Sequence, residues 1–370
     1  MTDQEPWISP GPGSGPGSYG GDGFRGGPNR SRGRVIAAAI LLLALISGTL
    51  TLLVIRSRTT AWPPSGWIFA ACDVGQGDAL ALAVGPGEAV VVDTGPDPAK
   101  ADHCLTVLGV RKVPLLVLTH FHADHIDGVP GVLKGRAVAE METTNDPDPP
   151  KGAAEVAAWA ESAGVRTSVA AAGEHRQFGP VSWDVLWPDP NASPPPTPPT
   201  TTTTTAPTTT ASPSPDPAHK SRRRGRHQSR ASPRGGGEEG SGPNDSSVVL
   251  QVTVATRDGP VRLLLTGDIE PPAQAAIVAA HPDLAADILK VPHHGSAHQD
   301  PDLFAAVHPR VAVISVGKGN TYGHPSPRAI ALATGAGTGA RTGARVFRTD
   351  EAGQVVVFGT ASRLRVAMRH

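Results

Sequence analysis

The sequence has very few cysteines. Of its 370 residues only two are cysteines, Cys72 and Cys104. Two cysteines allow at most one disulfide within the chain, which excludes a fold held together by several of them. The pair is equally compatible with one disulfide, as in an exported domain, and with two buried thiols. Both alternatives stay open, because a sequence does not show whether two side chains reach bridging geometry.

Two stretches have almost no apolar residues. Residues 1–34 include GPGSGPGSYGGDGFRGGP, and residues 191–243 contain a Pro/Thr-rich run followed by KSRRRGRHQSRASPRGGG. Without apolar surface to bury, such segments cannot offset the entropy lost on ordering, so we expect both to be disordered. The rest of the body, residues 67–190 and 244–370, comprises roughly 250 residues, which suffices for one hydrophobic core.

The chain also has no net charge, with 33 basic and 33 acidic residues. The balance depends on residues 217–234, which hold one lysine and six arginines and no acid. Without this run, 26 basic residues stand against 33 acidic ones, so the folded part is acidic. We favour a solvated linker for the basic run. The alternative is a nucleic-acid tether, whose binding would depend on salt.

Residues 35–55 lack any charge. This run of 21 residues, VIAAAILLLALISGTLTLLVI, is long enough to cross a bilayer as a helix. Four arginines precede it and two follow closely, which favours a cytoplasmic N-terminus and an extracytoplasmic body. A cleaved signal peptide is the alternative, but the run is longer than a usual signal core and no clear cleavage site follows. We therefore expect a single-pass membrane anchor.

The remaining residues alternate between strands and helices. Helices are expected at 98–110, 153–163 and about 272–280, and a terminal hairpin at 346–359. Strands dominate each half, which fits two sheets packed face to face with helices outside better than a doubly wound sheet. The expected strands, some running on into a turn or loop, lie within 67–84, 89–92, 113–120, 165–169, 181–186, 246–255, 261–268, 287–295 and 311–320.

A cluster of metal-binding residue types follows the apolar run VPLLVL. The segment LTHFHADHIDG contains His120, His122, Asp124 and His125. In an extended chain, residues two apart point the same way, so His120 and His122 can share one metal. Asp124 and His125, in the turn that follows, can bind a second metal. Imidazole and carboxylate together suit zinc, manganese or iron.

Other strand ends supply the missing ligands. Asp268 closes VRLLLTGD and is placed to bridge two cations, and His293 closes DILKVPH beside His294. Asp93 closes AVVVD and can orient a ligand from behind. Each alone is typical of a capped turn, but several such strand ends in one chain predict two-metal hydrolysis, in which a bridging water attacks the substrate.

These motifs resemble those of the metallo-β-lactamase superfamily. DVGQGD (73–78), NDSS (244–247), TGDIE (266–270), LKVPHHGS (289–296) and YGHP (322–325) narrow the resemblance to the hydrolase domain of ComEC-type DNA-uptake proteins. The resemblance implies an α/β (α+β) fold, a four-layer αββα sandwich, here preceded by one transmembrane helix. It also implies one metal on His120 and His122, and a second on Asp124, Asp268, His125 and His293, with Asp268 as the bridge.

The chain departs from this pattern at one ligand. Lactamase relatives supply a further histidine from a Gly-His motif in mid-chain, and none is present here. His175, the one histidine in the middle of the folded part, is expected in a turn. The NDSS motif stands in that place, so Asn244, Asp245 or Ser246 is expected to contact the metal or the substrate.

Further residues receive roles near the site. We assign Asp124, His294 and His324 to catalysis, with His324 donating to a phosphate oxygen or protonating the leaving group. Asp73 and Asp78 flank a glycine-rich turn and are expected behind the ligands or in the turn itself. This turn is not expected to cradle phosphate, because no helix N-terminus plainly follows it.

The sequence thus predicts a membrane-anchored hydrolase of phosphodiesters with two divalent metal ions, Zn or Mn, and DNA as its substrate. One span cannot form a channel, so a separate DNA-uptake channel protein is an expected partner. Two alternatives remain: a phosphodiesterase or esterase acting on cell-envelope material, and a non-catalytic DNA receptor.

Overall fold

The computed structural model describes residues 30–60, 62–189, 241–336 and 343–370. Its contacts divide the chain into two units, Met1–Thr60 and Ala61–His370. Most of the two segments expected to be disordered lies outside the described residues. The exceptions are residues 30–34, which belong to the first helix, and residues 241–243, which belong to the short helix α6 (Ser241–Asp245).

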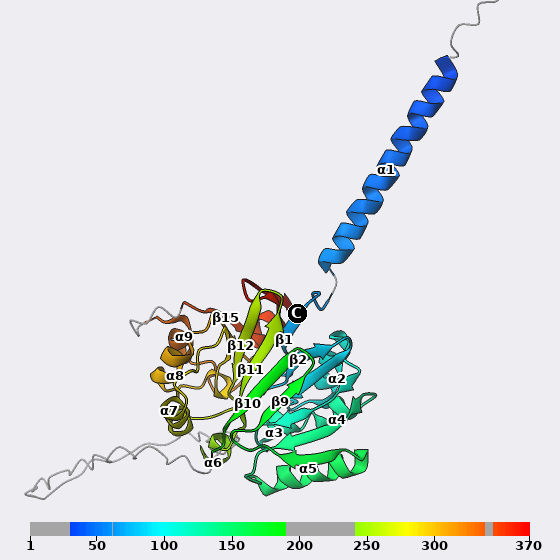
Figure 1. Cartoon of the computed structure of the whole chain (residues 1–370). Helices are drawn as coiled ribbons and strands as arrows, with labels where there is room; N and C mark the ends of the chain where they lie inside the picture. The colour runs from blue at the N-terminus through cyan, green and yellow to red at the C-terminus, as the bar shows by residue number, and fades with distance from the viewer. Residues whose placement is uncertain (1–29, 61, 190–240, 337–342) are drawn as a thin grey trace, which may run out of the picture. The chain divides into compact units, whose positions relative to one another are not determined.

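The first unit contains one long helix, α1 (Arg30–Thr60), drawn in blue in Figure 1. It includes the whole charge-free run 35–55, so the prediction of a helix there is confirmed. Its segment Arg34–Thr51 is apolar and long enough to cross a membrane, and none of it is buried. A signal sequence near an N-terminus has the same properties, so this helix by itself identifies no membrane topology.

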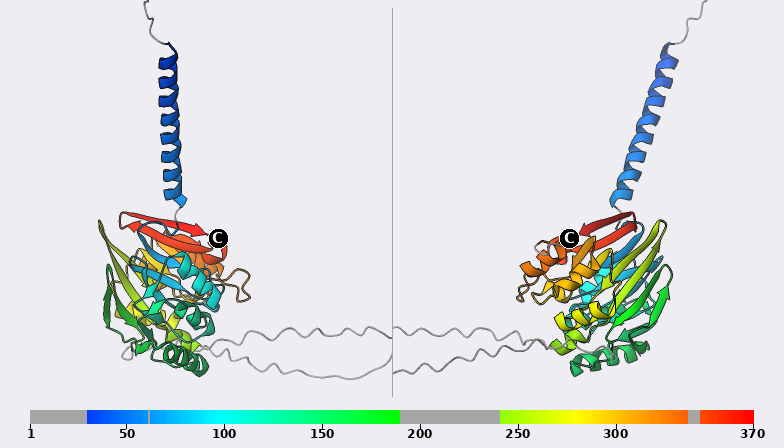
Figure 2. Two further views of the ribbon diagram at one scale, coloured as in Figure 1. Left: turned by 90° about the vertical axis from the view of Figure 1, so that its right-hand side faces the viewer. Right: turned by 60° about the vertical axis from the view of Figure 1, so that its left-hand side comes forward.

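The second unit is built on two β-sheets (Figures 1 and 2). The ten-stranded sheet has the order β17 (Arg363–Arg369), β16 (Gln354–Thr360), β1 (Trp67–Ala71), β2 (Leu80–Gly85), β3 (Glu88–Val92), β5 (Leu116–Leu118), β7 (Glu140–Thr143), β8 (Arg166–Val169), with β4 (Lys112–Val113) and β6 (Ala137–Val138) beside it. The seven-stranded sheet has the order β15 (Arg345–Arg348), β14 (Val311–Ile314), β13 (Ile288–Lys290), β12 (Gly259–Leu265), β11 (Val249–Thr256), β10 (Val181–Trp187), β9 (His175–Phe178).

Alternation along the strands divides the apolar residues between two faces of each sheet. In β11, Leu250 and Val252 enter the core between the sheets, where they meet Phe69 of β1. Val249 of the same strand points to the other face, where helices cover it. Two apolar faces on one strand require cover on both sides, which the helices supply.

Helices cover both outer faces, as Figure 1 shows. One set packs on the ten-stranded sheet and the other on the seven-stranded sheet, so the predicted four-layer αββα sandwich is confirmed. The first set is α2 (Pro98–Val107), α4 (Val129–Leu133) and α5 (Pro150–Ala163), and the second is α7 (Pro271–Ala280), α8 (Pro301–Val307) and α9 (Pro327–Thr334).

Two expectations about local structure were wrong or incomplete. Residues 346–359 do not form a hairpin: β15 pairs with β14 in one sheet, whereas β16 pairs with β1 in the other. The short helix α10 (Thr349–Ala352) replaces the expected turn, and the terminal hairpin joins β16 to β17 instead. Helices α8 and α9 were not predicted, although each begins with a proline after a capping residue, Asp300 or Ser326.

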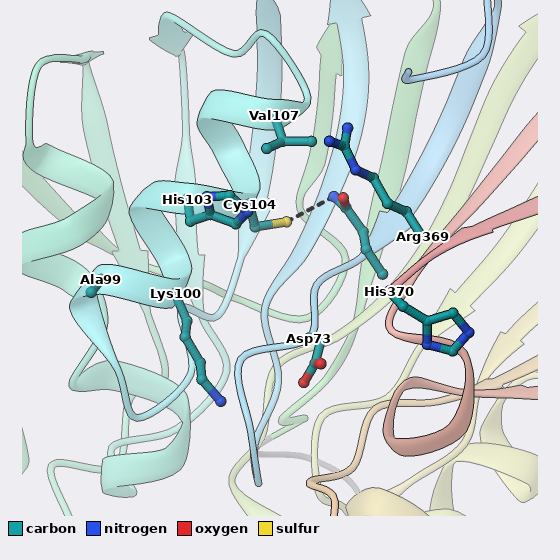
Figure 3. Close-up of a pocket in the computed structure, with 9 residues that line it drawn as sticks. Asp73, Ala99, Lys100, His103, Cys104, Val107, Arg369 and His370 are labelled. Carbon is teal, nitrogen blue, oxygen red and sulfur yellow. Dashed lines mark hydrogen bonds between the residues drawn. The ribbon is translucent and has the colours of Figure 1, made fainter. Parts of the chain in front are cut away.

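A disulfide joins Cys72, just after β1, to Cys104 of α2, which settles the alternative that the sequence left open. The amide of Gln354 donates to the Cys104 sulfur from 2.9 Å. Figure 3 shows this contact beside a cavity of about 290 Å³ that Asp73, Lys100 and Arg369 help to line. The bridge holds the start of the DVGQGD loop, and that loop leads to the candidate site.

Candidate metal centre

Parallel pairing brings the ends of several strands to the same edge of each sheet. β3 and β5 are parallel in one sheet, as are β12, β13 and β14 in the other. Polar side chains therefore gather where these strands end. One contact there joins Asp93, at the end of β3, to Thr119, at the end of β5. The Asp93 carboxylate accepts hydrogen bonds at 2.8 Å from both the backbone N–H and the hydroxyl of Thr119.

Four residues form a compact group at this edge: Asp124, His125, Asp268 and His294. Each offers one ligand atom, and all four atoms lie within 4.8 Å of one another. Oδ2 of Asp268 lies 3.1 Å from Nε2 of both His125 and His294, and Nε2 of His294 lies 3.1 Å from Oδ2 of Asp124. Two imidazoles and two carboxylates are a donor set that fits Zn²⁺ or Mn²⁺.

His294 occupies the place for which the sequence favoured His293. Nδ1 of His294 lies 2.9 Å from the Ser315 carbonyl oxygen, and this contact orients the ring toward Asp124 and Asp268. His293 instead lies beside Glu270, with Nδ1 3.3 Å from a carboxylate oxygen. Both histidines have positive φ, 46° and 51°, so the chain turns sharply between them. Such strained non-glycine residues concentrate at functional sites.

Comparison with known proteins identifies the family of the chain. The profile of the Metallo-beta-lactamase superfamily matches residues 72–300, more than half of the chain. The chain belongs to this superfamily. It is therefore a metallo-β-lactamase-fold hydrolase, and the superfamily implies divalent metal ions, which the four-residue group is chemically suited to bind.

The individual proteins that resemble the chain match only part of it or have low sequence identity. The chain is 35% identical over 113 residues to ComE operon protein 3 of Bacillus subtilis (strain 168), a match that covers 30% of this chain and 13% of that protein. Among solved structures, the subclass B3 enzyme MEM-A1 from a soil metagenome library is 14% identical over 62% of this chain and 77% of its own, with a TM-score of 0.36. The metallo-β-lactamase-fold protein YhfI from Bacillus subtilis is 9% identical over 76% and 96%, with a TM-score of 0.42.

Residues behind the group fix its orientation. Nδ1 of His125 lies 2.9 Å from Asp93, so the other ring nitrogen faces Asp268 in the manner of a carboxylate-oriented metal ligand. The ammonium of Lys290 lies 2.5 Å from Asp78 and 3.4 Å from Asp268. Asp78 therefore shares a buried cation with Asp268, which is consistent with its expected place behind the ligands.

The electrostatics follow from this crowding. Burial opposes the charged form of Asp268, but His294, His125 and Lys290 outweigh it and hold its pKa well below the usual value. Burial likewise opposes the charged forms of His125 and His294, yet Asp268 and the neighbouring carboxylates raise both pKa values. Burial raises the pKa of Asp93, although His125 opposes this. In the metal-free protein the carboxylates thus favour protonated imidazoles, and a bound cation would take the place of those protons.

His120 and His122, the two other histidines of the HxHxDH segment, lie beside the four-residue group. Nε2 of His120 and Nδ1 of His122 are 3.0 Å apart, so both reach one point, as expected from their spacing. Burial, followed by the charge of His125, lowers the pKa of His120 well below its usual value. Its imidazole is therefore neutral, which is the form that binds metals.

The NDSS motif also reaches this region, but through a residue that sequence reasoning missed. The Ser247 hydroxyl lies 3.3 Å from Nδ1 of His120 and accepts a hydrogen bond from the Asp268 backbone N–H at 3.1 Å. Asn244 is wholly buried, and neither atom of its amide makes a hydrogen bond to a described residue. Ser246 is buried nearby and bonds to the Pro243 carbonyl. Ser247 is the second serine of NDSS, so the motif itself could have suggested it as a site residue.

Asp245 holds the backbone beside the site. Its carboxylate accepts a hydrogen bond from the Glu270 backbone N–H at 2.8 Å. Burial is the main cause that raises the pKa of Asp245 to about 6. Asp73 takes the second of the two places expected for it: it is exposed in the turn, where Oδ1 accepts a hydrogen bond from the Gly75 N–H at 3.4 Å, and it helps to line the cavity in Figure 3. The expectation for His175 was wrong, because His175 begins β9, where it pairs with exposed Asp184, and does not lie in a turn.

The DVGQGD loop packs against the metal group instead of forming a phosphate cradle. Gly77, with φ of 134°, comes so close to the Asp124 carbonyl that a Cβ would lie 2.1 Å from its oxygen. The next residue, Asp78, donates its N–H to that same carbonyl at 3.2 Å. A glycine is therefore required where the loop crosses the HxHxDH segment.

His324 lies at the margin of the site. Its ring centroid is 5.4 Å from that of His293, and Nδ1 of His324 is buried without a hydrogen-bond partner among the described residues. Burial, with the charges of His293 and His294, lowers its pKa to about 4. A histidine that is neutral at pH 7 suits hydrogen bonding to a phosphate oxygen better than protonation of a leaving group.

Proposed function

We propose that this chain is a membrane-anchored, metal-dependent phosphodiesterase whose substrate is DNA. The observation that carries the hydrolytic part is the Asp268 carboxylate, which contacts His125 and His294 within a four-residue donor set. The DNA part rests on the similarity to ComE operon protein 3 and on the ordered motifs DVGQGD, NDSS, HHGS and YGHP.

We assign one cation to Asp124, His125, Asp268 and His294, with His294 in place of His293. His120, His122 and Asp268 would hold a second cation, and Ser247 would orient His120. Divalent cations, when bound, activate water and stabilise charge that develops on a phosphoryl oxygen.

The protein's own groups prepare this chemistry. Asp93 contacts the imidazole of His125, and Ser247 contacts that of His120. Both rings are therefore held with their ligand nitrogens already oriented. Lys290 limits the excess of negative charge beneath Asp268. His324, neutral and with a free Nδ1 among the described residues, is placed in our assignment to hydrogen-bond a phosphate oxygen.

For localisation we propose that α1 anchors the protein with its N-terminus in the cytoplasm. The arginines before α1's apolar run support this orientation. The Cys72–Cys104 disulfide supports an extracytoplasmic body, because disulfides persist mainly in oxidising compartments. Among the described residues one helix is suited to span a membrane, so in DNA uptake a separate channel protein would have to supply the passage.

The decisive experiment compares variants of the full chain in detergent, loaded with Zn²⁺ or Mn²⁺. We expect wild-type protein to cleave DNA, and Asp268→Ala and His122→Ala each to lose several orders of magnitude, because loss of a ligand disables water activation. Asp184→Asn, an exposed aspartate paired with His175, is the matched control and should retain full activity. Undiminished cleavage by either ligand variant would refute the site assignment.

The same assay separates the alternatives. Cleavage of glycerol-phosphate or choline-phosphate esters in preference to DNA would assign the enzyme to cell-envelope material. Metal-loaded protein that binds DNA but cleaves no phosphodiester would be a receptor. We favour the enzyme because the donor set is nearly complete, and a binding module has no need of it.

A further inference from the structure

In the loop 317–326, which follows β14, the side chain of Asn320 makes four hydrogen bonds to the backbone. The Asn320 amide donates to the carbonyls of Gly317 and His324, at 3.0 and 2.7 Å. Its oxygen accepts from the backbone N–H groups of Tyr322 and His324, at 3.1 and 3.2 Å. Four hydrogen bonds from one amide fix the positions of Tyr322 and His324.

This loop is also attached to the metal-binding segments. The Ser326 N–H donates to the Gly295 carbonyl at 2.7 Å, and the Ser326 hydroxyl donates to the Ser296 carbonyl at 3.1 Å. At its other end, the Gly317 N–H donates to the Gln76 side chain at 3.2 Å. The loop therefore lies against both the HHGS and the DVGQGD segments, and its geometry is tied to theirs.

Tyr322 is exposed on this otherwise well-anchored loop. Its exposed fraction is 55%. Among the described residues from 62 onward, the large exposed hydrophobic side chains are Val169, Tyr322 and Met368, so Tyr322 is the aromatic one among them. Because Asn320 holds the Tyr322 backbone N–H, the loop presents this ring from a fixed backbone position, which lowers the entropy lost when a ligand binds.

A series of rings leads from Tyr322 to the metal group. The ring centroids of Tyr322 and His324 are 5.9 Å apart, those of His324 and His293 are 5.4 Å apart, and those of His293 and His294 are 6.1 Å apart. Tyr322 is thus three ring contacts from a proposed metal ligand. Lys318, exposed on the same loop, adds a positive charge.

We propose that Tyr322 and Lys318 form a nucleotide-binding platform beside the metal group, on which an unpaired nucleobase next to the scissile phosphodiester stacks. An exposed aromatic ring and a cation on one loop are the combination that binds single-stranded nucleic acid, because every base has a stackable face and every linkage a negative charge. Bases inside a duplex are already stacked on one another and would have to leave the helix to reach Tyr322. The platform therefore selects single-stranded over double-stranded DNA. This inference rests on the proposed function and extends it.

The test measures binding and cleavage separately, with the full metal-loaded chain in detergent. The probes are a fluorescent single-stranded oligonucleotide and the same strand with abasic residues, which keeps the phosphates but lacks bases. Wild-type protein should bind the intact strand about tenfold more tightly than the abasic one, the size expected for one base on one aromatic ring. Tyr322→Ala should lose this preference, Tyr322→Trp should keep it, and Met368→Ala, an exposed side chain on β17, is the control.

We expect a different change in binding when Lys318 is replaced. Lys318→Ala should weaken the binding of intact and abasic strands by the same factor and should reduce the salt dependence of binding, because the lysine contacts phosphate. Equal affinity of the wild type for intact and abasic strands would overturn the platform, as would an equal effect of Tyr322→Ala on both. Base-selective binding without cleavage would refute the phosphodiesterase and leave the platform standing.

Discussion

The Lys290 ammonium lies 2.5 Å from the Asp78 carboxylate, and both side chains are wholly excluded from solvent. Asp78 ends the DVGQGD loop, whereas Lys290 ends β13, so the pair joins two segments 212 residues apart in sequence. The same ammonium lies 3.4 Å from Asp268. One buried cation thus balances two carboxylates directly beneath the metal group.

Replacing Lys290 with methionine should strongly destabilise the fold. The variant leaves buried carboxylates without their cation, and breaking a buried pair from one side costs about 3–5 kcal/mol. Urea denaturation followed by tryptophan fluorescence measures the loss. Combining Lys290→Met with Asp78→Asn should recover part of it, because the second change removes one of the orphaned charges.

The control for this prediction is Lys112→Met, which removes an exposed lysine that lies 2.8 Å from Glu88. An exposed pair contributes about 0–1 kcal/mol, so this variant should unfold at nearly the wild-type urea concentration. Equal losses for Lys290→Met and Lys112→Met would show that the buried ammonium has no special part in stability.

Two neighbouring histidines should differ sharply in metal binding. His294 contacts Asp124 and Asp268, whereas His293 lies beside Glu270, so His294→Ala should lose about one equivalent of bound metal and His293→Ala should not. Mass spectrometry of the metal content, after dialysis against a weak chelator, gives the count per chain. The opposite result would restore the assignment of His293 that the sequence suggested.

The sequence predicted the scaffold of the site because strand ends are easy to recognise. Apolar runs that stop at Asp93, His120 and Asp268 place these residues at a sheet edge, and the pairing of β3, β5, β12 and β13 brings them together. The dominance of strands in each half, with helices between them, likewise predicted two sheets with helices outside. These features depend on periodicity, which a sequence carries directly.

Other features depend on long-range contacts and could not be read in this way. In HHG, the backbone rotation at two positive-φ residues decides which histidine faces the metal group, and no pattern of residue types encodes it. Lys290 lies in an apolar strand and looks out of place until Asp78 is seen beside it. The false hairpin at 346–359 arose because a local turn signal gives no information about which sheet each strand joins.

The disulfide should contribute to stability mainly by restricting the unfolded chain. Cys72 and Cys104 are separated by 32 residues, and closing a loop of this length stabilises a fold by about 4 kcal/mol through the entropy of the unfolded chain. Cys72→Ala/Cys104→Ala should therefore unfold at lower urea concentration. Dithiothreitol should destabilise the wild type and leave the double variant unchanged. Two thiols that react with maleimide in denatured, unreduced protein would show that no bridge forms.

Asp245 should make stability depend on pH. Its pKa in the folded protein is raised to about 6, mainly by burial, whereas an unfolded aspartate titrates near 3.9. Between these values the unfolded chain loses its proton first, so this residue lowers stability as the pH rises and has its full effect above about pH 6. Allowing for its partial exposure, the effect is about 1 kcal/mol.

Asp245→Asn should therefore raise the melting temperature of the metal-free protein by about 2–4 °C at pH 8 and leave it nearly unchanged at pH 4, where the wild-type carboxyl is already neutral. The asparagine oxygen can still accept the hydrogen bond from the Glu270 N–H, so the change removes the charge without removing the contact. Asp184→Asn, at an exposed aspartate, is the control and should show no such difference between the two pH values. A gain of equal size at pH 4 and pH 8 would mean that the Asp245 charge is not the cause.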